Sequence, residues 1–312
     1  MENLIISVNV VLPLFICIVL GYFLRRIRMV EEGTLKAMNK LCFKVFLPIY
    51  LFNSVYAADL AAAFNGRLIV FAIVGLLILF LLLMLVIPII EKDNARRGVM
   101  VQAIFRSNFA LFGLPVATSL CGEENIGPTS LLLGIGVPLF NILAVITLET
   151  FRGKKPSVRK MVKGVATNPL IIACVLGIFF NLLQIQLPYA VEKAAADLGR
   201  TATPLSLVVL GGEFVFGKVK GYVKQLSITM LSKLVLSPLI MVSIGIMLGF
   251  RNEMLVPILI MFGAPTAVSS FTMAQEMEGD ADLAGEVVVF TSGASIVTMF
   301  LWVFVLKQLG FI

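Results

Sequence analysis

The chain has 312 residues, is 59% hydrophobic, carries a formal net charge of +7 and contains no histidine. Soluble domains are about 45–50% apolar, so this composition, with its many apolar runs of about 20 residues, predicts an integral membrane protein. The lack of histidine removes the commonest metal ligand and proton shuttle. The basic residues form no patch with interleaved aromatic side chains, which argues against a nucleic-acid partner. We expect no cofactor, and we expect the four cysteines, which lack CxxC spacing, to be buried apolar side chains.

Ten hydrophobic ranges are predicted as transmembrane helices of an all-α polytopic protein. They are residues 5–24, 37–57, 68–90, 98–120, 127–150, 167–186, 193–213, 223–249, 255–277 and 283–308. The N-terminus has no signal-peptide pattern, because Glu2 stands where a basic region is required. The first range is therefore predicted to be a retained span that crosses the lipid bilayer.

The two halves of the chain share a pattern. Residues 13–21 (PLFICIVLG) align with residues 169–177 (PLIIACVLG), and the same offset places Pro48 on Pro204. Five spans per half is an odd number, so the second half must have the opposite orientation in the membrane. This predicts two inverted five-helix repeats, at residues 1–150 and 167–312, separated by a basic loop at residues 151–166.

Lysine and arginine are concentrated in alternate loops. One such loop holds Arg25, Arg26 and Arg28, and the loop at residues 151–166 is the longest and most basic. Because cytoplasmic loops carry the positive excess, we expect both termini to lie outside the inner membrane of a bacterial cell.

The fourth and ninth ranges are interrupted by small, polar and proline residues. The interruptions are residues 108–115 (NFALFGLP) and 263–270 (GAPTAVSS). Asn108 lies eleven residues after Arg97, which at about 1.5 Å per residue is roughly 16 Å into the membrane. Paired breaks in related helices are a sequence indicator of a transporter's binding site. An ordinary proline kink in each helix is the alternative interpretation.

If the two interruptions face each other, the freed N–H groups of the half-helices favour a carboxylate. Asn108 offers an amide, and the second interruption offers three hydroxyl groups. The candidate substrate-binding residues are Asn53, Asn108, Gly113, Pro115, Pro265, Thr266, Ser269 and Ser270. For Asn53, an interhelical hydrogen bond is the competing interpretation.

Two basic residues are predicted to lie deep in the membrane. Arg106 directly precedes the first interruption, and Lys233 is about ten residues into the eighth range. They indicate either an anionic substrate or a structural ion pair, for which Glu213 is the candidate partner of Lys233. Glu149 and Glu286 are expected to be solvated at helix ends.

Several of these segments together resemble the auxin efflux carrier family, in its short, malate permease-like bacterial form. The matching segments are Pro48 with Leu51-Phe52-Asn53, Arg106-Ser-Asn108 through Gly113-Leu-Pro115, Lys233 with Pro238, and residues 264–270. The resemblance implies a scaffold part, a transport part that moves as an elevator, and an organic-anion site where the fourth and ninth helices cross. The short middle loop departs from the long plant carriers, so their phosphorylation control is not implied.

The sequence therefore predicts a secondary transporter of a small organic anion, such as an auxin-like monocarboxylate or malate, with a possible homodimer. It contains no phosphate-binding loop, HExxH or GxSxG motif, which argues against an enzyme. The alternatives are a sodium-coupled symporter of the bile-acid-symporter-like plan and a membrane sensor that does not transport.

Overall fold

The computed structural model describes residues 2–57, 65–153, 158–214 and 221–312, and these residues form helices and connecting segments without a β-strand. The first half comprises α1 (Glu2–Arg26), α2 (Glu32–Leu41), the π-helix η1 (Cys42–Phe46), α3 (Leu47–Tyr56), α4 (Gly66–Ile90), α5 (Asn94–Phe105), α6 (Phe109–Cys121), the 3-10 helix η2 (Glu123–Asn125) and α7 (Gly127–Phe151). The second half comprises α8 (Val158–Ala166), α9 (Pro169–Leu182), α10 (Tyr189–Glu213), α11 (Val223–Leu231), the π-helix η4 (Ser232–Leu236), α12 (Ser237–Met247), the 3-10 helix η5 (Asn252–Met254), α13 (Leu255–Gly263), α14 (Ser269–Glu276) and α15 (Ala281–Gln308). Helical structure thus covers most of each predicted range.

Four helical stretches in the described residues are long and apolar enough to cross a membrane. They are Gly66–Ile90, Gly127–Phe151, Val223–Met247 and Ala281–Gln308. Shorter apolar helices lie at Phe109–Cys121, Pro169–Leu182 and Asn252–Gly263. These segments define an all-α, multi-pass membrane protein, because a single helix can satisfy its own backbone polar groups in lipid.

Polar side chains fix the starts of several helices. The side-chain oxygen of Asn65 accepts the Leu68 N–H at the start of α4, and Asp93 accepts the Arg96 N–H at the start of α5. Asn168 caps α9 and Asp280 caps α15 in the same way. Each bond satisfies an N–H group that has no partner within its own helix.

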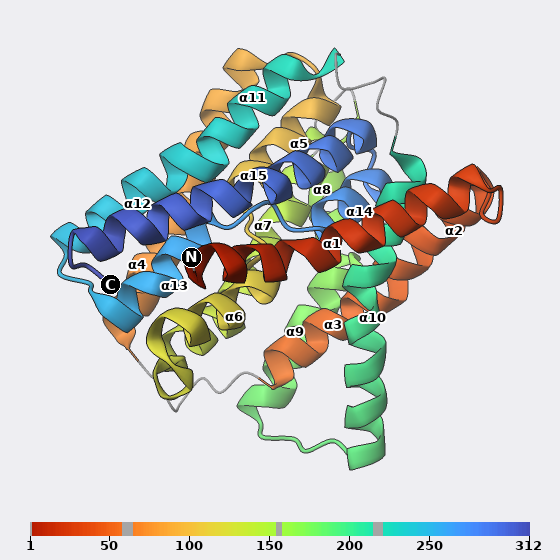
Figure 1. Ribbon diagram of the computed structural model, residues 1–312. Coiled ribbons are helices and arrows are strands. Elements are labelled where there is room, and N and C mark those ends of the chain that lie inside the picture. The colour runs from red at the N-terminus through yellow and green to blue at the C-terminus, as the bar shows by residue number, and fades with distance from the viewer. Residues whose placement is uncertain (1, 58–64, 154–157, 215–220) are drawn as a thin grey trace.

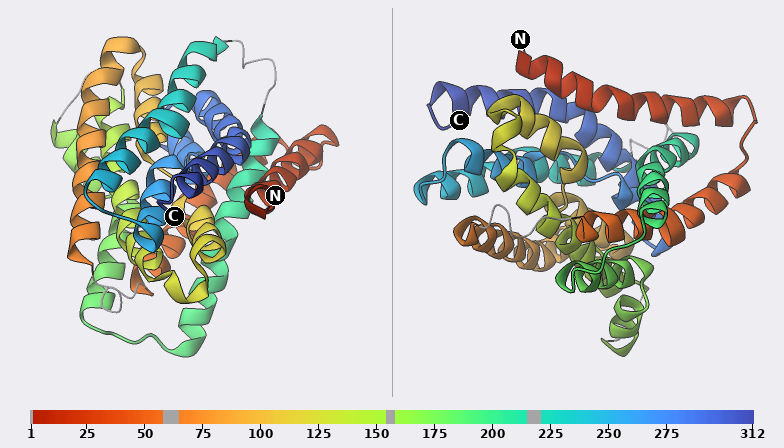
Figure 2. Two further views of the ribbon diagram at one scale, coloured as in Figure 1. Left: turned by 60° about the vertical axis from the view of Figure 1, so that its left-hand side comes forward. Right: turned by 90° about the horizontal axis from the view of Figure 1, so that it is seen from below.

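The helices pack as two groups (Figures 1 and 2). The first group is α1, α2 with η1 and α3, α9 and α10; the second is α4 to α7 and α11 to α15. Gly21 and Gly211 allow α1 and α10 to approach closely, since a Cβ atom at either position would overlap a backbone oxygen of the other helix. The start of α1 and the end of α15 lie at the same end of the bundle (Figure 2).

Both π-helices end directly before a proline-containing helical turn. Pro238, the second residue of α12, has no N–H group and so leaves a carbonyl of the preceding turn without its usual partner. The indole N–H of Trp302 on α15 donates to the Leu234 carbonyl at 3.0 Å. This hydrogen bond links η4 to α15 at the residue directly after Lys233.

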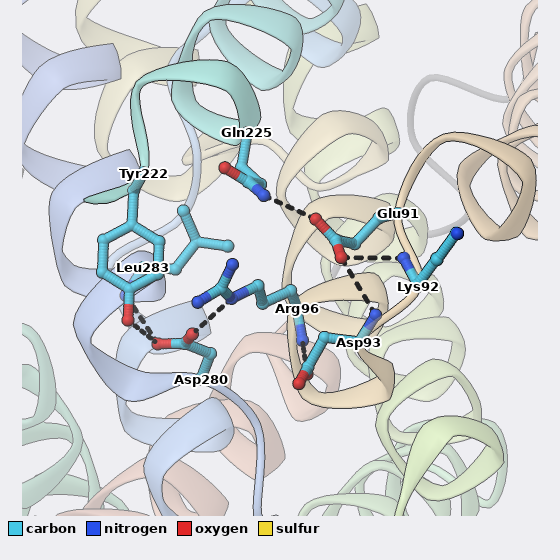
Figure 3. A network of polar contacts seen from close by, with 8 residues as sticks. All are labelled: Glu91, Lys92, Asp93, Arg96, Tyr222, Gln225, Asp280 and Leu283. Atoms are coloured by element: carbon cyan, nitrogen blue, oxygen red, sulfur yellow. Dashed lines mark hydrogen bonds and ion pairs between the residues drawn. The ribbon is translucent and has the colours of Figure 1, made fainter. Parts of the chain in front are cut away.

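A polar network joins the starts of α5, α11 and α15 (Figure 3). Asp280 pairs with Arg96 at 3.3 Å and accepts the Tyr222 hydroxyl at 3.1 Å. Glu91 accepts two backbone N–H groups and the amide of Gln225. Burial raises the pKa of the Glu91 carboxyl, but the hydrogen bonds from Asp93, Gln225 and Lys92 outweigh that effect and lower it overall.

Candidate functional site

The fourth predicted helix is interrupted at Arg106–Asn108 in the structure, earlier than most of the predicted segment. Helix α5 ends at Phe105 and α6 begins at Phe109. Pro115, which we predicted to lie in the unwound segment, is an exposed residue inside α6. Gly113 is also helical and packs against Leu133 and Phe109. The prediction for these two residues was wrong in position because a membrane helix tolerates a proline without unwinding.

The ninth predicted helix is interrupted at residues 264–268, between α13 and α14, as the sequence indicated. The two interruptions lie against each other. Ser107 and Thr266 form an isolated antiparallel bridge, and the Asn108 N–H donates to the Pro265 carbonyl at 2.8 Å. Thr266 also donates from its hydroxyl to the Ala103 carbonyl at 2.9 Å. Several backbone groups freed by the breaks are therefore paired across the crossover, and the Thr266 N–H donates to the Thr291 hydroxyl of α15 at 3.2 Å, as a non-aqueous environment requires.

A cavity of about 350 Å³ lies where this crossover faces the first helix group. Its walls come from α1, α3 and α10 on one side, and from residues 106–111, α7 and residues 267–269 on the other. Most of the lining is apolar, including Leu14, Leu51 and Phe140. The cavity thus lies between the two groups rather than inside either one.

Arg106 is a charged side chain of the cavity wall and is only 2% exposed. Its guanidinium donates to the Asn141 side-chain oxygen at 2.5 Å, to the Ser269 hydroxyl at 2.6 Å and to the Met273 sulfur at 2.8 Å. No carboxylate within the described ranges forms an ion pair with it. Its positive charge is consequently held by neutral groups only.

Asn108 lines the same cavity at the start of α6 and is 6% exposed. Its side-chain nitrogen is buried and has no hydrogen-bond partner among the described residues. An unpaired buried amide is costly, by about 1–3 kcal/mol, unless another group accepts its hydrogens. The arrangement leaves a donor beside Arg106 that a bound acceptor could satisfy.

The remaining candidate residues take different places. Ser269 lines the cavity, whereas Pro265, Thr266 and Ser270 are buried in the crossover behind it. Asn53 on α3 is directed toward Gly199 of α10, and its side-chain nitrogen has no partner in the described part of the chain. Of the residues predicted for the site, Arg106, Asn108 and Ser269 therefore line the cavity.

Lys233 is completely buried and reaches the crossover from η4, where its ammonium group donates to the Ser107 hydroxyl. It does not pair with Glu213, whose carboxylate accepts the Gln275 amide at 2.5 Å.

The solvated positions expected for two other carboxylates were also wrong. Glu286 is 2% exposed, and the Glu149 side chain is 7% exposed and pairs with Arg152 at 3.0 Å.

Sequence reasoning missed several polar residues of the cavity, of which three stand out. Asn141 on α7 orients Arg106, Tyr50 on α3 lines the wall, and Arg200 on α10 lies at the rim with its side chain 82% exposed. An asparagine three residues after Pro138 within an apolar stretch was the available signal for Asn141. Tyr50 and Arg200 carried no distinguishing local pattern.

Several membrane-length helices, two interrupted helices that cross, and a buried guanidinium at the adjoining cavity define a membrane transporter rather than an enzyme. The comparisons agree with this class. The chain belongs to the auxin efflux carrier family, since the family model described as "Membrane transport protein" matches residues 6–303.

The chain is similar over nearly its whole length to proteins named as transporters. It is 24% identical to an uncharacterized transporter of Methanothermobacter thermautotrophicus, over 96% of this chain and 98% of that protein. It is 22% identical to one from Methanocaldococcus jannaschii, over 96% and 99%. It is 25% identical to the uncharacterized transporter YfdV of Escherichia coli K12, over 94% and 96%.

Proposed function

We propose that this membrane transporter is a secondary carrier of a small organic anion, which binds in the crossover cavity. The observation that carries the proposal is the Arg106 guanidinium, which is buried at the cavity wall and has only neutral partners in the described structure. A charged side chain in mid-membrane costs at least about 2.5–3.5 kcal/mol on insertion scales. A bound anion would offset that cost.

The carboxylate group is the proposed recognition element. The guanidinium fork matches a carboxylate in two parallel hydrogen bonds, and the free amide of Asn108, two residues further along the chain, lines the same cavity. Ser269 adds a hydroxyl at the start of α14. These groups favour binding of one carboxylate by Arg106, Asn108 and Ser269.

The size and lining of the cavity favour an organic rather than an inorganic anion. Small-molecule pockets have volumes of about 300–1,000 Å³, and this cavity, at about 350 Å³, is at the lower end. Leu14, Leu51 and Phe140 offer an apolar wall to the body of the ligand. An auxin-like monocarboxylate fits this lining better than malate, because the second carboxylate of malate would have only the exposed Arg200 at the rim as a basic partner among the described residues.

The proposed transport step is movement of the second helix group, with the crossover, relative to the first. The cavity lies between the groups, and several polar contacts also link them, among them the Thr272 hydroxyl of α14, which donates to Ser206 of α10 at 3.0 Å. In this proposal the two halves of the sequence are the inverted repeats predicted above, and both termini are outside the bacterial inner membrane. The first helix group would form any homodimer contact.

A thermal-shift screen of the purified protein against monocarboxylates and dicarboxylates tests the proposed site. A ligand that binds only the folded protein raises the melting temperature with ligand concentration. We expect a monocarboxylate to raise it, Asn108→Ala to abolish the rise, and Asn125→Ala, which changes an exposed asparagine outside the cavity, to preserve it. An equal shift in Asn108→Ala, or no shift with any carboxylate, would overturn the proposal.

A further inference from the structure

The crossover contains a second buried cation that the anion site does not use. Lys233 is 0% exposed and is not part of the cavity wall. Its ammonium group donates to the hydroxyl of Ser107, the central residue of the first interruption. The Ser107 hydroxyl in turn donates to the Met261 carbonyl on α13. Lys233 thereby links η4 to both broken helices.

The local structure holds this ammonium group in place. Lysines near helix ends commonly extend toward the interface, and Lys44, in the other π-helix, is exposed. Lys233 instead points inward from η4, which the Trp302–Leu234 bond fastens to α15. No ion pair within the described ranges includes Lys233. A buried cation that lacks an acidic partner and is held by a hydroxyl calls for an explanation other than a structural salt bridge.

Broken helices in transporters have a known affinity for free cations. Their unwound backbones present carbonyl and hydroxyl oxygens, which coordinate hard cations such as sodium. Here the Ser107 hydroxyl, an oxygen of this kind, receives the lysine ammonium group instead. When protonated, Lys233 supplies one positive charge at this point, and its covalent link to the chain prevents exchange of that charge with solution.

We propose that Lys233 is a tethered cation that takes the place of a coupling metal ion at the crossover, so that anion binding is independent of sodium. This inference rests on the proposed function for its ligand. Arg106 and Lys233 together place two fixed positive charges on neighbouring parts of the crossover. They attract an anion and repel a further cation.

The test compares melting temperatures of the purified protein in sodium, methylammonium and choline chloride at equal ionic strength. We expect the native protein to melt at the same temperature in all three salts. Lys233→Ala should melt several degrees lower in choline, which is too large to enter, and should recover at least half of the loss as methylammonium or sodium is added to saturation. Lys44→Ala, the matched control in the other π-helix, should show no dependence on the cation.

Three results would overturn the tethered-cation proposal. The first is a higher melting temperature of the native protein in sodium than in choline. The second is a Lys233→Ala variant that melts at the native temperature. The third is a Lys233→Ala variant whose melting temperature is lowered and is not restored by any of the cations. If Lys233→Ala does not fold, the native protein still decides the matter, because its shift with a carboxylate must be equal in sodium and in choline. If the rise in melting temperature with a carboxylate depends on sodium, the tethered-cation proposal is refuted and the anion site is kept. If cations restore the stability of Lys233→Ala but no carboxylate raises the melting temperature of the native protein, only the anion site is refuted.

Discussion

Arg106 is the residue on which recognition of an anion depends most. Its three neutral partners fix the guanidinium plane from α7 and α14, so the side chain is oriented before any ligand arrives. Such preorganisation favours binding, because the ligand does not have to order the side chain.

Arg106→Lys should separate charge from geometry. The lysine keeps the positive charge but cannot bond Asn141, Ser269 and a carboxylate in the same planar arrangement. We expect the carboxylate affinity to fall by about tenfold or more, which corresponds to about 1.4 kcal/mol, and Arg106→Met to lose binding altogether. Ligand titration by thermal shift measures this, and unchanged affinity in Arg106→Lys would show that the fork geometry is not used.

Glu91 provides a residue-scale test outside the membrane-spanning segments. Its folded-state pKa is below the ordinary value of 4.5, so its stabilising effect is complete above that pH and is lost as the pH falls through the folded pKa. Melting temperatures measured from neutral pH to below 4.5 should fall more steeply for the native protein than for Glu91→Gln. Parallel curves would contradict the role assigned to the Glu91 hydrogen bonds.

Residue types and spacing pointed to Arg106, Asn108 and Ser269, which line one cavity in the structure. A cation and an asparagine next to a helix break are unusual in an apolar segment, so local sequence carries the signal. Gly113 and Pro115 were misplaced because the position of the break depends on pairing with residues 264–268, which are distant in the chain.

At the scale of helices, the contact between α1 and α10 depends on two glycines. Gly211 faces the backbone oxygen of Ile18, and Gly21 faces that of Val208. Backbones this close leave no volume for a side chain, as in other small-residue interfaces between membrane helices.

Gly211→Ala should therefore force α1 and α10 apart. Overpacking of this kind costs about 1–3 kcal/mol, and here the obstacle is backbone, which cannot move aside as a side chain would. Gly33→Ala is the matched control, since a Cβ atom at Gly33 meets nothing within 4 Å. Thermal unfolding in detergent should show a lower melting temperature for Gly211→Ala only; equal melting temperatures would contradict the close approach.

Helix positions were largely predictable, whereas their irregularities were not. The apolar ranges and the caps at Asn65, Asp93 and Asp280 follow from local sequence. The π-helices at Cys42–Phe46 and Ser232–Leu236 do not, because the proline that follows each of them is equally compatible with an α-helical turn. Only the structure places Lys233 against Ser107, since that contact joins residues far apart in the chain.

For the whole molecule, the proposed movement of one helix group against the other predicts a specific effect of cross-linking. Ser206 and Thr272 lie on opposite sides of the interface and share a hydrogen bond. In a Cys42→Ser background, the pair Ser206→Cys and Thr272→Cys should form a disulfide that stops transport, while carboxylate binding persists and reductant restores transport.

A cross-link within the first group provides the control. Native Cys42 lies 3.1 Å from the Ser206 hydroxyl on α10, so Ser206→Cys alone can bridge two helices of that group. Oxidation of this single variant should leave transport intact. Full transport by the oxidised double variant would show that the two groups do not slide at this interface.

The most direct test of organic-anion transport is counterflow in proteoliposomes. Vesicles loaded with the carboxylate identified by thermal shift are diluted into medium containing a trace of the labelled compound, in choline rather than sodium salt. We expect transient accumulation of label with the native protein and with Asn125→Ala, and none with Asn108→Ala. Accumulation in Asn108→Ala at the native rate, or its absence in the native protein with every carboxylate that binds, would contradict the account.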